Sequence, residues 1–287
     1  MLRVCVLLAV SLSAASVCWA QKPPQPTRKQ TYKTIGTVQL QMHIFEPKGH
    51  RVADRRSAIV FFFGGGWVGG RPSQFYPHAA HLAEHGMLAM CAEYRVRKTH
   101  GTTPFECVQD GKSAIRWVRK HAAQLGVDAD RIAAGGGSAG GHVAAATATV
   151  PGLDQPGEDR GMSPRPGALV LFNPVYDNGP DGYGYDRVKP RYREISPLHN
   201  IDEKTPPAIV FLGTRDKLIP VSTAKEFQAR MCGVGVRSEL ILFADQPHGF
   251  FNFGRGDGSH YRKTVAAMDG FLRSLKYLPP VAAKPPR

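Results

Sequence analysis

The chain has 287 residues, of which 42% are hydrophobic and 21% are charged, and these fractions are ordinary for a globular protein. The composition therefore argues against wholesale disorder, and the length allows one large α/β domain or two small ones. The formal net charge is +14, but the Lys and Arg residues are scattered, with no long basic run and no interleaved aromatic array. We therefore expect no nucleic-acid partner, although such a charge favours an acidic polysaccharide or an anionic surface.

The first 20 residues are typical of a secretory signal peptide. Residues 4–10 are apolar after Arg3, and Ala20 is a small residue suited to cleavage. A lipid anchor on Cys18 is the alternative, but the bulky Val17 before it fits a lipoprotein cleavage box poorly. No later stretch has the ~18 apolar residues expected of a membrane span. We therefore predict a protein that is secreted or periplasmic after signal removal, with no stable membrane anchor.

The rest of the chain reads as one domain with short extensions. Residues 21–31 hold three prolines and are expected to form a linker, residues 32–278 the domain, and residues 279–287 a flexible tail. Three cysteines remain after signal removal, and this odd, sparse set does not make a disulfide scaffold. The sequence leaves open whether two of Cys91, Cys107 and Cys232 pair or all three are thiols.

The domain begins with loosely alternating apolar residues over 32–47, which are typical of an antiparallel hairpin at a sheet edge. Short apolar runs that indicate strands then alternate with longer runs that indicate helices. Strands are predicted at 58–63, 87–92, 131–134, 168–172, 208–212 and 239–243, and helices at 75–85, 105–125, 143–148, 221–231 and 260–275. This order predicts an α/β fold with a mostly parallel central sheet and helices on both faces, in which ligands bind at the carboxyl ends of the strands.

A glycine-rich turn joins one of these strands to the alanine-rich helix that follows it. Gly136-Gly137-Ser138-Ala139-Gly140 fits the pattern G-x-S-x-G in a strand–turn–helix context. Small neighbours let the backbone bend sharply and let a substrate approach the serine oxygen. The helix N-terminus offers free N–H groups to a developing oxyanion. The pattern alone is weak, because an ordinary tight turn between strand and helix has the same composition.

A serine nucleophile needs a base and an acid that orients the base. Asp216 and His248 each follow a predicted strand, and they occur after Ser138 in the chain order of the strand–elbow–helix hydrolases. Two alternatives stay open: Asp216 can simply cap the following helix, and Asp245 is a nearby acid, although it is more typical of a turn. His142, next to the serine turn, is expected to pack locally rather than act as the base.

A second glycine run follows the first buried strand. Gly64-Gly65-Gly66 can turn its backbone N–H groups toward a ligand, because no Cβ obstructs them. We predict that the N–H groups of Gly65, Gly66 and Ala139 are the oxyanion donors. A phosphate-binding loop is the alternative, but no Lys-Ser/Thr follows and the spacing does not fit G-x-G-x-x-G.

Taken together, these motifs resemble those of the α/β-hydrolase superfamily, in its acetyl-esterase and hormone-sensitive-lipase-like branch, over about residues 32–278. Beyond the Ser, Asp and His, the resemblance rests on Gly64-Gly65-Gly66-Trp67, Glu93-Tyr94-Arg95, Asp110, Ile115-Arg116-Trp117, residues 128–131, Gly137-Ser138-Ala139-Gly140-Gly141-His142 and Pro247-His248-Gly249-Phe250. It implies the α/β-hydrolase fold and ester hydrolysis through an acyl-enzyme, with no metal and no organic cofactor. Secreted enzymes that remove acetyl or feruloyl groups from plant polysaccharides are similar in layout.

One position departs from the family pattern. The usual motif is His-Gly-Gly-Gly, but Phe63 stands where the histidine would be. In the family that histidine is understood to brace the oxyanion loop, so the departure bears on loop rigidity rather than on the mechanism. The chain also lacks the long N-terminal extension that forms a lid in many lipase-like members, which favours an open site and short acyl groups.

The main insertion, residues 172–195, is rich in tyrosine and follows a strand over the carboxyl edge of the sheet. Tyr176, Tyr183 and Tyr185, together with Trp67, are candidates for a substrate wall, because aromatic rings stack on sugar or aryl rings. The alternative is a surface loop that packs only on itself.

We therefore predict a serine esterase in which His248 takes the proton of Ser138 and Asp216 holds the imidazolium. The expected substrates are short-acyl esters of small molecules or polysaccharides, such as acetylated xylan. Two alternatives are a serine peptidase of the same fold, disfavoured because such peptidases usually carry a large extra domain, and a catalytically silent binding module. The oligomeric state is left open.

Overall fold

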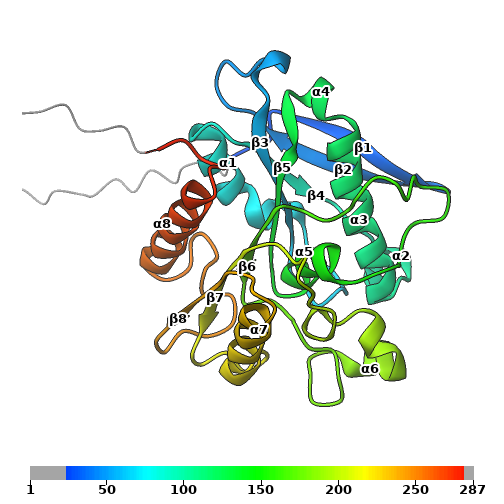
Figure 1. The fold of residues 1–287 in the computed structure, drawn as a ribbon, viewed down its shortest axis with the longest axis vertical. Helices are drawn as coiled ribbons and strands as arrows, with labels where there is room; N and C mark the ends of the chain where they lie inside the picture. The colour runs from blue at the N-terminus through cyan, green and yellow to red at the C-terminus, as the bar shows by residue number, and fades with distance from the viewer. Residues whose placement is uncertain (1–23, 281–287) are drawn as a thin grey trace, which may run out of the picture.

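Eight strands form one sheet through the middle of the molecule in the computed structural model, which describes residues 24–280 (Figure 1). The strands are β1 (Arg28–Ile35), β2 (Val38–Phe45), β3 (Arg56–Phe62), β4 (Leu88–Ala92), β5 (Val127–Gly137), β6 (Ala168–Phe172), β7 (Ala208–Gly213) and β8 (Ser238–Phe243). Their order across the sheet is β1-β2-β4-β3-β5-β6-β7-β8. β2 pairs antiparallel with β1 and β4, and the other neighbours pair in parallel. The prediction of a mostly parallel sheet is confirmed.

The edge hairpin of β1 and β2 begins earlier than predicted. β1 starts at Arg28 rather than at residue 32, so residues 28–31 belong to the domain and not to a linker. Gly36, with φ of 54°, lies in the turn between the two strands, a conformation that glycine adopts without strain. The predicted signal peptide, the first part of the linker and the tail beyond residue 280 lie outside the described residues.

The central strands are apolar throughout because each contributes to two cores. In β3, Val60 and Phe62 point into one hydrophobic cluster, and Ile59 and Phe61 point into the other. The alternation follows from the period of two along a strand. A continuous apolar run is therefore the expected signature of a strand covered on both faces.

Helices cover both faces of the sheet (Figure 1). α1 (Tyr76–Glu84) and α8 (Ser259–Ser274) pack on one face, and α3 (Pro104–Lys120), α5 (Ala139–Thr149) and α7 (Val221–Gly233) pack on the other. Three single-turn helices, α2 (Arg97–His100), α4 (Ala122–Leu125) and α6 (Tyr185–Val188), and four 3₁₀ segments, Val52–Asp54, Pro72–Phe75, Lys189–Glu194 and Pro197–His199, lie in the connections. The single helix predicted at 105–125 is two helices, α3 and α4, which meet at His121, and α4 ends at Leu125 with Gly126 as its C-cap.

A buried carboxylate joins the edge hairpin to α3. Asp110 is fully buried, and its Oδ1 accepts a hydrogen bond of 2.7 Å from Lys33 Nζ. Arg95 donates to both carboxylate oxygens, at 2.8 and 2.9 Å. A buried charge is tolerated only when it is paired in this way. Asp110 and Arg95, two positions of the family motif, therefore have a structural role.

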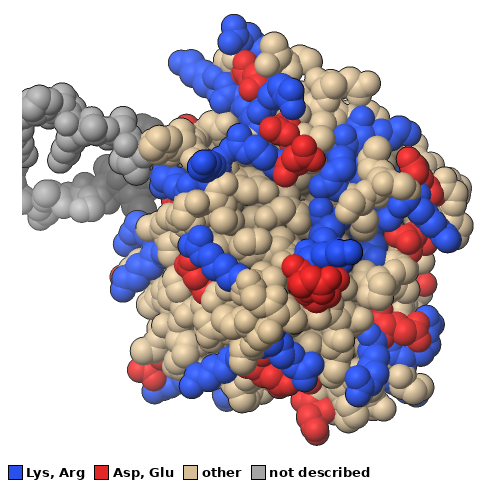
Figure 2. Space-filling view, in the orientation of Figure 1, with Lys and Arg blue, Asp and Glu red and all other residues tan. Residues whose placement is uncertain are grey.

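The cysteines and the charged surface answer two other questions left by the sequence. Cys91 and Cys107 are buried thiols, Cys232 is an exposed one, and all three are free. On the face shown in Figure 2, Lys and Arg are interspersed with Asp and Glu rather than gathered in one patch. Among residues 24–280, no helix is both long enough and apolar enough to cross a bilayer.

Candidate active site

Ser138 lies at the turn between β5 and α5 with φ of 54° and ψ of −122°, a strained conformation for a residue with a side chain. The turn closes only because its neighbours lack Cβ atoms. A Cβ on Gly136 would lie 2.5 Å from the Gly140 carbonyl, and one on Gly140 would lie 2.1 Å from the Phe62 oxygen. The N–H of Ser138 donates to the Phe172 carbonyl at 3.0 Å and ties the turn to β6. The serine is therefore held in the strand–turn–helix geometry that its sequence pattern predicts.

Asp216 and His248 are brought together from the ends of β7 and β8. His248 Nδ1 lies 2.7 Å from Asp216 Oδ2, and the carboxylate is fully buried. Its other oxygen, Oδ1, accepts from the N–H groups of Leu218 and Ile219, at 2.8 and 3.0 Å. Asp216 thus stabilises the turn after β7 and orients the imidazole at the same time. Since an ionised carboxylate can only accept, the proton lies on Nδ1, and Nε2 carries the lone pair that a base needs.

Asn173 is a site residue that the sequence analysis missed. It directly follows β6 with φ of 33°, and it is fully buried. Its Oδ1 accepts from the N–H of Gly249 at 3.0 Å, and its Nδ2 lies 3.4 Å from His248 Nε2. A polar residue at the carboxyl end of a buried strand was the signal that could have identified it.

The glycine loop after β3 presents free donors. Gly65 and Gly66 have φ of 127° and 61°, and a Cβ on Gly65 would lie 2.1 Å from the Gly69 oxygen. These positions therefore require glycine. The N–H groups of Gly65, Gly66 and Ala139 make no hydrogen bond to another residue within 24–280. They remain available to a ligand, as the predicted donors must.

A chain of side-chain hydrogen bonds ties this loop to the turn that carries His248. The N–H of Gly64 donates to Gln74 Oε1 at 2.6 Å, and Gln74 Nε2 donates to Asn252 Oδ1 at 2.9 Å. Asn252 Nδ2 in turn donates to the Gly249 carbonyl at 2.8 Å. The donor loop and the imidazole are therefore positioned by one connected network, which sequence spacing gave no means of finding.

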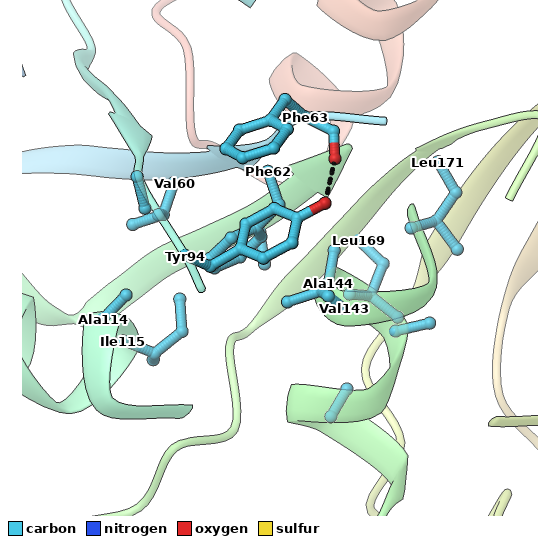
Figure 3. Close-up of a cluster of buried hydrophobic side chains, with 14 of the residues drawn as sticks. Val60, Phe62, Phe63, Tyr94, Ala114, Ile115, Val143, Ala144, Leu169 and Leu171 are labelled. Carbon is cyan, nitrogen blue, oxygen red and sulfur yellow. Dashed lines mark hydrogen bonds between the residues drawn. The ribbon is translucent and has the colours of Figure 1, made fainter. Parts of the chain in front are cut away.

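The residue that replaces the family histidine is braced by an aromatic neighbour. Phe63 stacks on Tyr94 with ring centroids 4.2 Å apart and an interplanar angle of 16°. The Tyr94 hydroxyl donates to the Phe63 carbonyl at 2.6 Å, as Figure 3 shows. Both side chains are buried. Stacking and a backbone hydrogen bond therefore hold the start of the glycine loop in the absence of the histidine.

Ser138, His248 and Asn173 line one cleft of about 660 Å³ together with residues 64–66 of the glycine loop. Its remaining lining residues are Val68, Gly70, Arg71, Ser73, Gln74, Tyr183, Arg187, Leu218, Gly249, Phe251, Asn252 and Arg255. The lining is thus partly polar, and it places the serine, the imidazole and the glycine loop with the free N–H groups of Gly65 and Gly66 around one space.

Only one of the four predicted wall residues lines this cleft. Tyr183 contributes to it, but Tyr176 is fully buried and stacks on Phe227 at 4.4 Å. Trp67 is only 1% exposed, and neither it nor Tyr185 lines the cleft. The prediction is therefore wrong for Trp67, Tyr176 and Tyr185, because the local sequence does not tell which rings face the cleft.

The two rival residues of the sequence analysis lie elsewhere. His142 is fully buried, Nε2 lies 2.9 Å from the Ile195 carbonyl, and burial lowers the pKa of the ring to about 4. Asp245 is exposed in a turn with φ of 59° and pairs with Arg215 at 2.9 Å. His142 therefore packs locally, and Asp245 is a turn residue, as predicted.

The whole architecture is shared with solved structures of esterase 2 from Thermogutta terrifontis. The apo form has a TM-score of 0.87 and 45% sequence identity, over 92% of this chain and 99% of that chain. The propionate-bound form has a TM-score of 0.85 and 45% identity, over 89% of this chain and 96% of that chain. The chain belongs to the α/β-hydrolase esterases. The predicted family and its hormone-sensitive-lipase-like branch are confirmed.

Two family models match different parts of this α/β-hydrolase esterase. Residues 42–163 match the BD-FAE model, and residues 182–281 match the dienelactone hydrolase family. Among curated proteins, the probable carboxylic ester hydrolase LipM of Mycobacterium tuberculosis is 30% identical over 242 residues, which cover 74% of this chain and 53% of LipM. The matched part of this chain spans only about half the length of LipM and of the esterases LipC and LipQ from the same organism.

Proposed function

We propose that this α/β-hydrolase esterase is a serine carboxylic-ester hydrolase that acts through an acyl-enzyme on short-acyl esters. The observation that carries the proposal is the 2.7 Å contact between His248 and the buried Asp216, in the same cleft as the strained Ser138. A nucleophile, a base and an orienting acid that meet in this way are the requirements of acyl transfer.

In the proposed mechanism, Ser138 Oγ attacks the ester carbonyl carbon while His248 Nε2 takes its proton. The oxyanion that forms accepts hydrogen bonds from the free N–H groups of the glycine loop and Ala139. When it collapses, the bond to the alcohol oxygen breaks, and the imidazolium returns the proton to that oxygen. A water molecule, deprotonated by the same Nε2, then attacks the acyl-enzyme and releases the acid and free serine.

Short acyl groups are the proposed preference. Support comes from the similar Thermogutta terrifontis esterase 2, which has been solved with propionate and with butyrate bound. That esterase is also phosphorylated by paraoxon, so we expect paraoxon to inactivate this protein at Ser138. Small-molecule esters and acetylated polysaccharides such as xylan are the proposed substrates, and the exposed mouth at Arg71, Ser73 and Arg255 leaves room for a polymer.

The proposed location is outside the cytoplasm, and it rests on the signal-like pattern of the first 20 residues. N-terminal sequencing of the protein secreted by its host would test this. A mature chain that begins at Gln21 is expected, and an intact N-terminus in the cell interior would refute it.

The decisive experiment is hydrolysis of p-nitrophenyl acetate, butyrate and octanoate by the wild type and by Ser138→Ala. Rates should fall from the acetate and butyrate esters to the octanoate, and Ser138→Ala should lose activity on all three by about 10⁴-fold or more. Ser73→Ala is the matched control, because Ser73 lines the same cleft, and it should stay within about threefold of wild type.

Acetate release from acetylated xylan, measured in parallel, tests the polysaccharide substrate. Release that depends on Ser138 supports it, and activity confined to the nitrophenyl esters would refute it. Equal, slow rates for wild type and Ser138→Ala on every ester would refute the esterase proposal and favour a binding module.

A further inference from the structure

Three arginines line the cleft around Ser138, and they come from separate segments of the chain. Arg71 lies between β3 and α1, Arg187 lies on α6, and Arg255 lies between β8 and α8. Among the described residues, no Asp or Glu lines the same cleft. The charged side chains that line the cleft are therefore all positive. On the face shown in Figure 2, by contrast, positive and negative side chains are mixed.

None of the three arginines is used in an ion pair with another described residue. Many other arginines are, such as Arg215 with Asp245 at 2.9 Å. A guanidinium has five N–H donors. Arg187 donates one hydrogen bond, of 2.7 Å, from Nη1 to the Gly66 carbonyl. Within residues 24–280, the side chains of Arg71 and Arg255 make no hydrogen bond. Most of the donors around the cleft are thus free for a ligand.

Two of these cations lie beside segments that position the reacting groups. Arg187 Nη1 lies 3.2 Å from the point that a Cβ would occupy if Gly66 had a side chain. Its guanidinium lies 5.4 Å from the centre of the Tyr183 ring. Arg255 Nη2 lies 4.0 Å from the position of a Cβ on Gly249, the residue after His248. One cation is therefore next to the oxyanion loop, and the other is next to the histidine turn.

From this arrangement we propose that the cleft selects esters whose alcohol portion carries a carboxylate, such as an acetylated saccharide that contains a uronic acid. The inference rests on the proposed esterase function. Arg71 and Arg255 are exposed at the mouth, so they meet the part of the substrate that protrudes. For a short-acyl ester, that part is the alcohol. A planar guanidinium binds a carboxylate through two parallel hydrogen bonds, which makes arginine the suited residue.

The test compares 3-acetoxybenzoate, an anionic acetyl ester, with the neutral 3-acetoxybenzamide. For each ester, kcat/KM is divided by the rate of its uncatalysed hydrolysis, which corrects for the different reactivity of the two esters. The normalised value for the anionic ester is then divided by that for the neutral ester, and this anionic-to-neutral ratio is compared between variants. We expect a wild-type ratio of about ten at low salt, which falls as salt is added. In the double variant Arg71→Gln/Arg255→Gln the ratio should fall to about one.

The matched control removes two positive charges elsewhere. Lys225→Gln/Lys263→Gln changes exposed residues on α7 and α8, outside the cleft, and it should keep the wild-type ratio. A wild-type ratio near one would overturn the proposal, and so would an equal loss in the lysine control, which would indicate only a general charge effect. Neither result would contradict the proposed esterase function. That proposal fails only if Ser138-dependent hydrolysis is absent for both esters.

A second substrate pair tests which side of the ester carries the anion. Mono-p-nitrophenyl succinate has a carboxylate on the acyl group, and p-nitrophenyl butyrate has none. We expect the succinate to be no better than the butyrate. A preference for the succinate without one for 3-acetoxybenzoate would overturn the placement on the alcohol.

Discussion

The Tyr94 hydroxyl donates a 2.6 Å hydrogen bond to the carbonyl of Phe63 while the two rings stack at 4.2 Å. Phe63 is the last residue before the glycine loop, and it occupies the position where the family usually has histidine. The stacked rings and the hydrogen bond to the Phe63 carbonyl together hold the start of the glycine loop in place (Figure 3). The departure from the family motif is therefore compensated within the core.

Tyr94→Phe should remove the hydrogen bond and keep the stacking. We expect the free energy of unfolding to fall by about 1 kcal/mol, because the buried Phe63 carbonyl loses its partner. We expect kcat to fall by about tenfold. This is less than for direct loss of an oxyanion donor, because the loop keeps its N–H donors and is only held less rigidly. Tyr176→Phe is the control, because that hydroxyl is buried without a partner among the described residues. Unchanged kcat in Tyr94→Phe would show that Phe63 needs no bracing.

Asp216→Asn should lower kcat by about 10³- to 10⁴-fold with little change in the fold, because an amide no longer holds the imidazole in the right tautomer. Steady-state kinetics on p-nitrophenyl acetate would measure this. Asp245→Asn is the comparison, since Asp245 is only three residues from His248 but exposed and paired with Arg215. A larger loss in Asp245→Asn than in Asp216→Asn would reverse the assignment of the acid.

Asn173→Asp should shift the pH dependence of the reaction. The Asn173 amide nitrogen lies 3.4 Å from His248 Nε2, so a carboxylate there would stabilise the protonated ring. The acid limb of kcat/KM against pH should therefore move to higher pH, while the bond from Gly249 to Oδ1 is kept. Asn173→Ala should lower kcat without moving the limb in this direction. An identical pH profile for Asn173→Asp and wild type would show that Asn173 only holds the backbone.

Gly140→Ala should prevent the serine turn from closing. Its Cβ would lie 2.1 Å from the Phe62 carbonyl oxygen, which is backbone and cannot move aside. We expect a loss of at least about 3 kcal/mol in the free energy of unfolding, or insoluble protein. Gly270→Ala in α8, where no atom lies within 4 Å of the new Cβ, should instead raise stability by about 0.5–1 kcal/mol. Thermal melts of the two variants would check both, and a Gly140→Ala protein as stable as wild type would refute the close approach.

Stability should fall steeply in acid because of His78. This ring is fully buried among aromatic side chains, neither nitrogen has a partner among the described residues, and burial lowers its pKa to about 3. The unfolded chain binds a proton below about pH 6.5, whereas the folded chain does not until about pH 3. The contribution of His78 to the free energy of unfolding is therefore constant above about pH 6.5, and at pH 5 this contribution is lower by about 2 kcal/mol.

His78→Leu should reduce that acid loss, as followed by urea unfolding between pH 7 and pH 5, and leave the part that comes from His142, whose pKa burial lowers to about 4. His121→Leu, at the half-buried end of α3, should keep the wild-type slope. An unchanged slope in His78→Leu would contradict the role given to burial.

Much of the fold could be predicted because its signals are local. The strand at Ala168–Phe172 has the predicted bounds, since a short run of apolar, partly β-branched residues specifies a doubly covered strand without outside information. The helix predicted at 105–125 failed only at His121, where element boundaries depend on packing. The hairpin start was missed because the residues before 32 are polar, and only their pairing with β2 makes them a strand.

The candidate site was predictable where chemistry fixes the residue type. Ser138, Asp216 and His248 were identified because each follows a strand, and their roles require those side chains. Asn173 was missed although its place directly after a buried strand was a signal, and Gln74 was missed because an amide that positions a loop has no motif. Gln74 and Asn252, which are hydrogen-bonded, are 178 residues apart in the chain.

The mostly parallel sheet, the glycine turn at Ser138 and the chain order of the Ser, Asp and His could all be predicted from the sequence, because periodicity, backbone freedom and chain order are properties of short segments. Which side chains face the cleft became clear only from the packing of the folded chain. In the fold, Tyr183 lines the cleft and Tyr176 lies in the core, while Arg71, Arg187 and Arg255 come to the cleft from three separate segments. Such choices depend on how distant segments pack against one another, and no single segment carries that information.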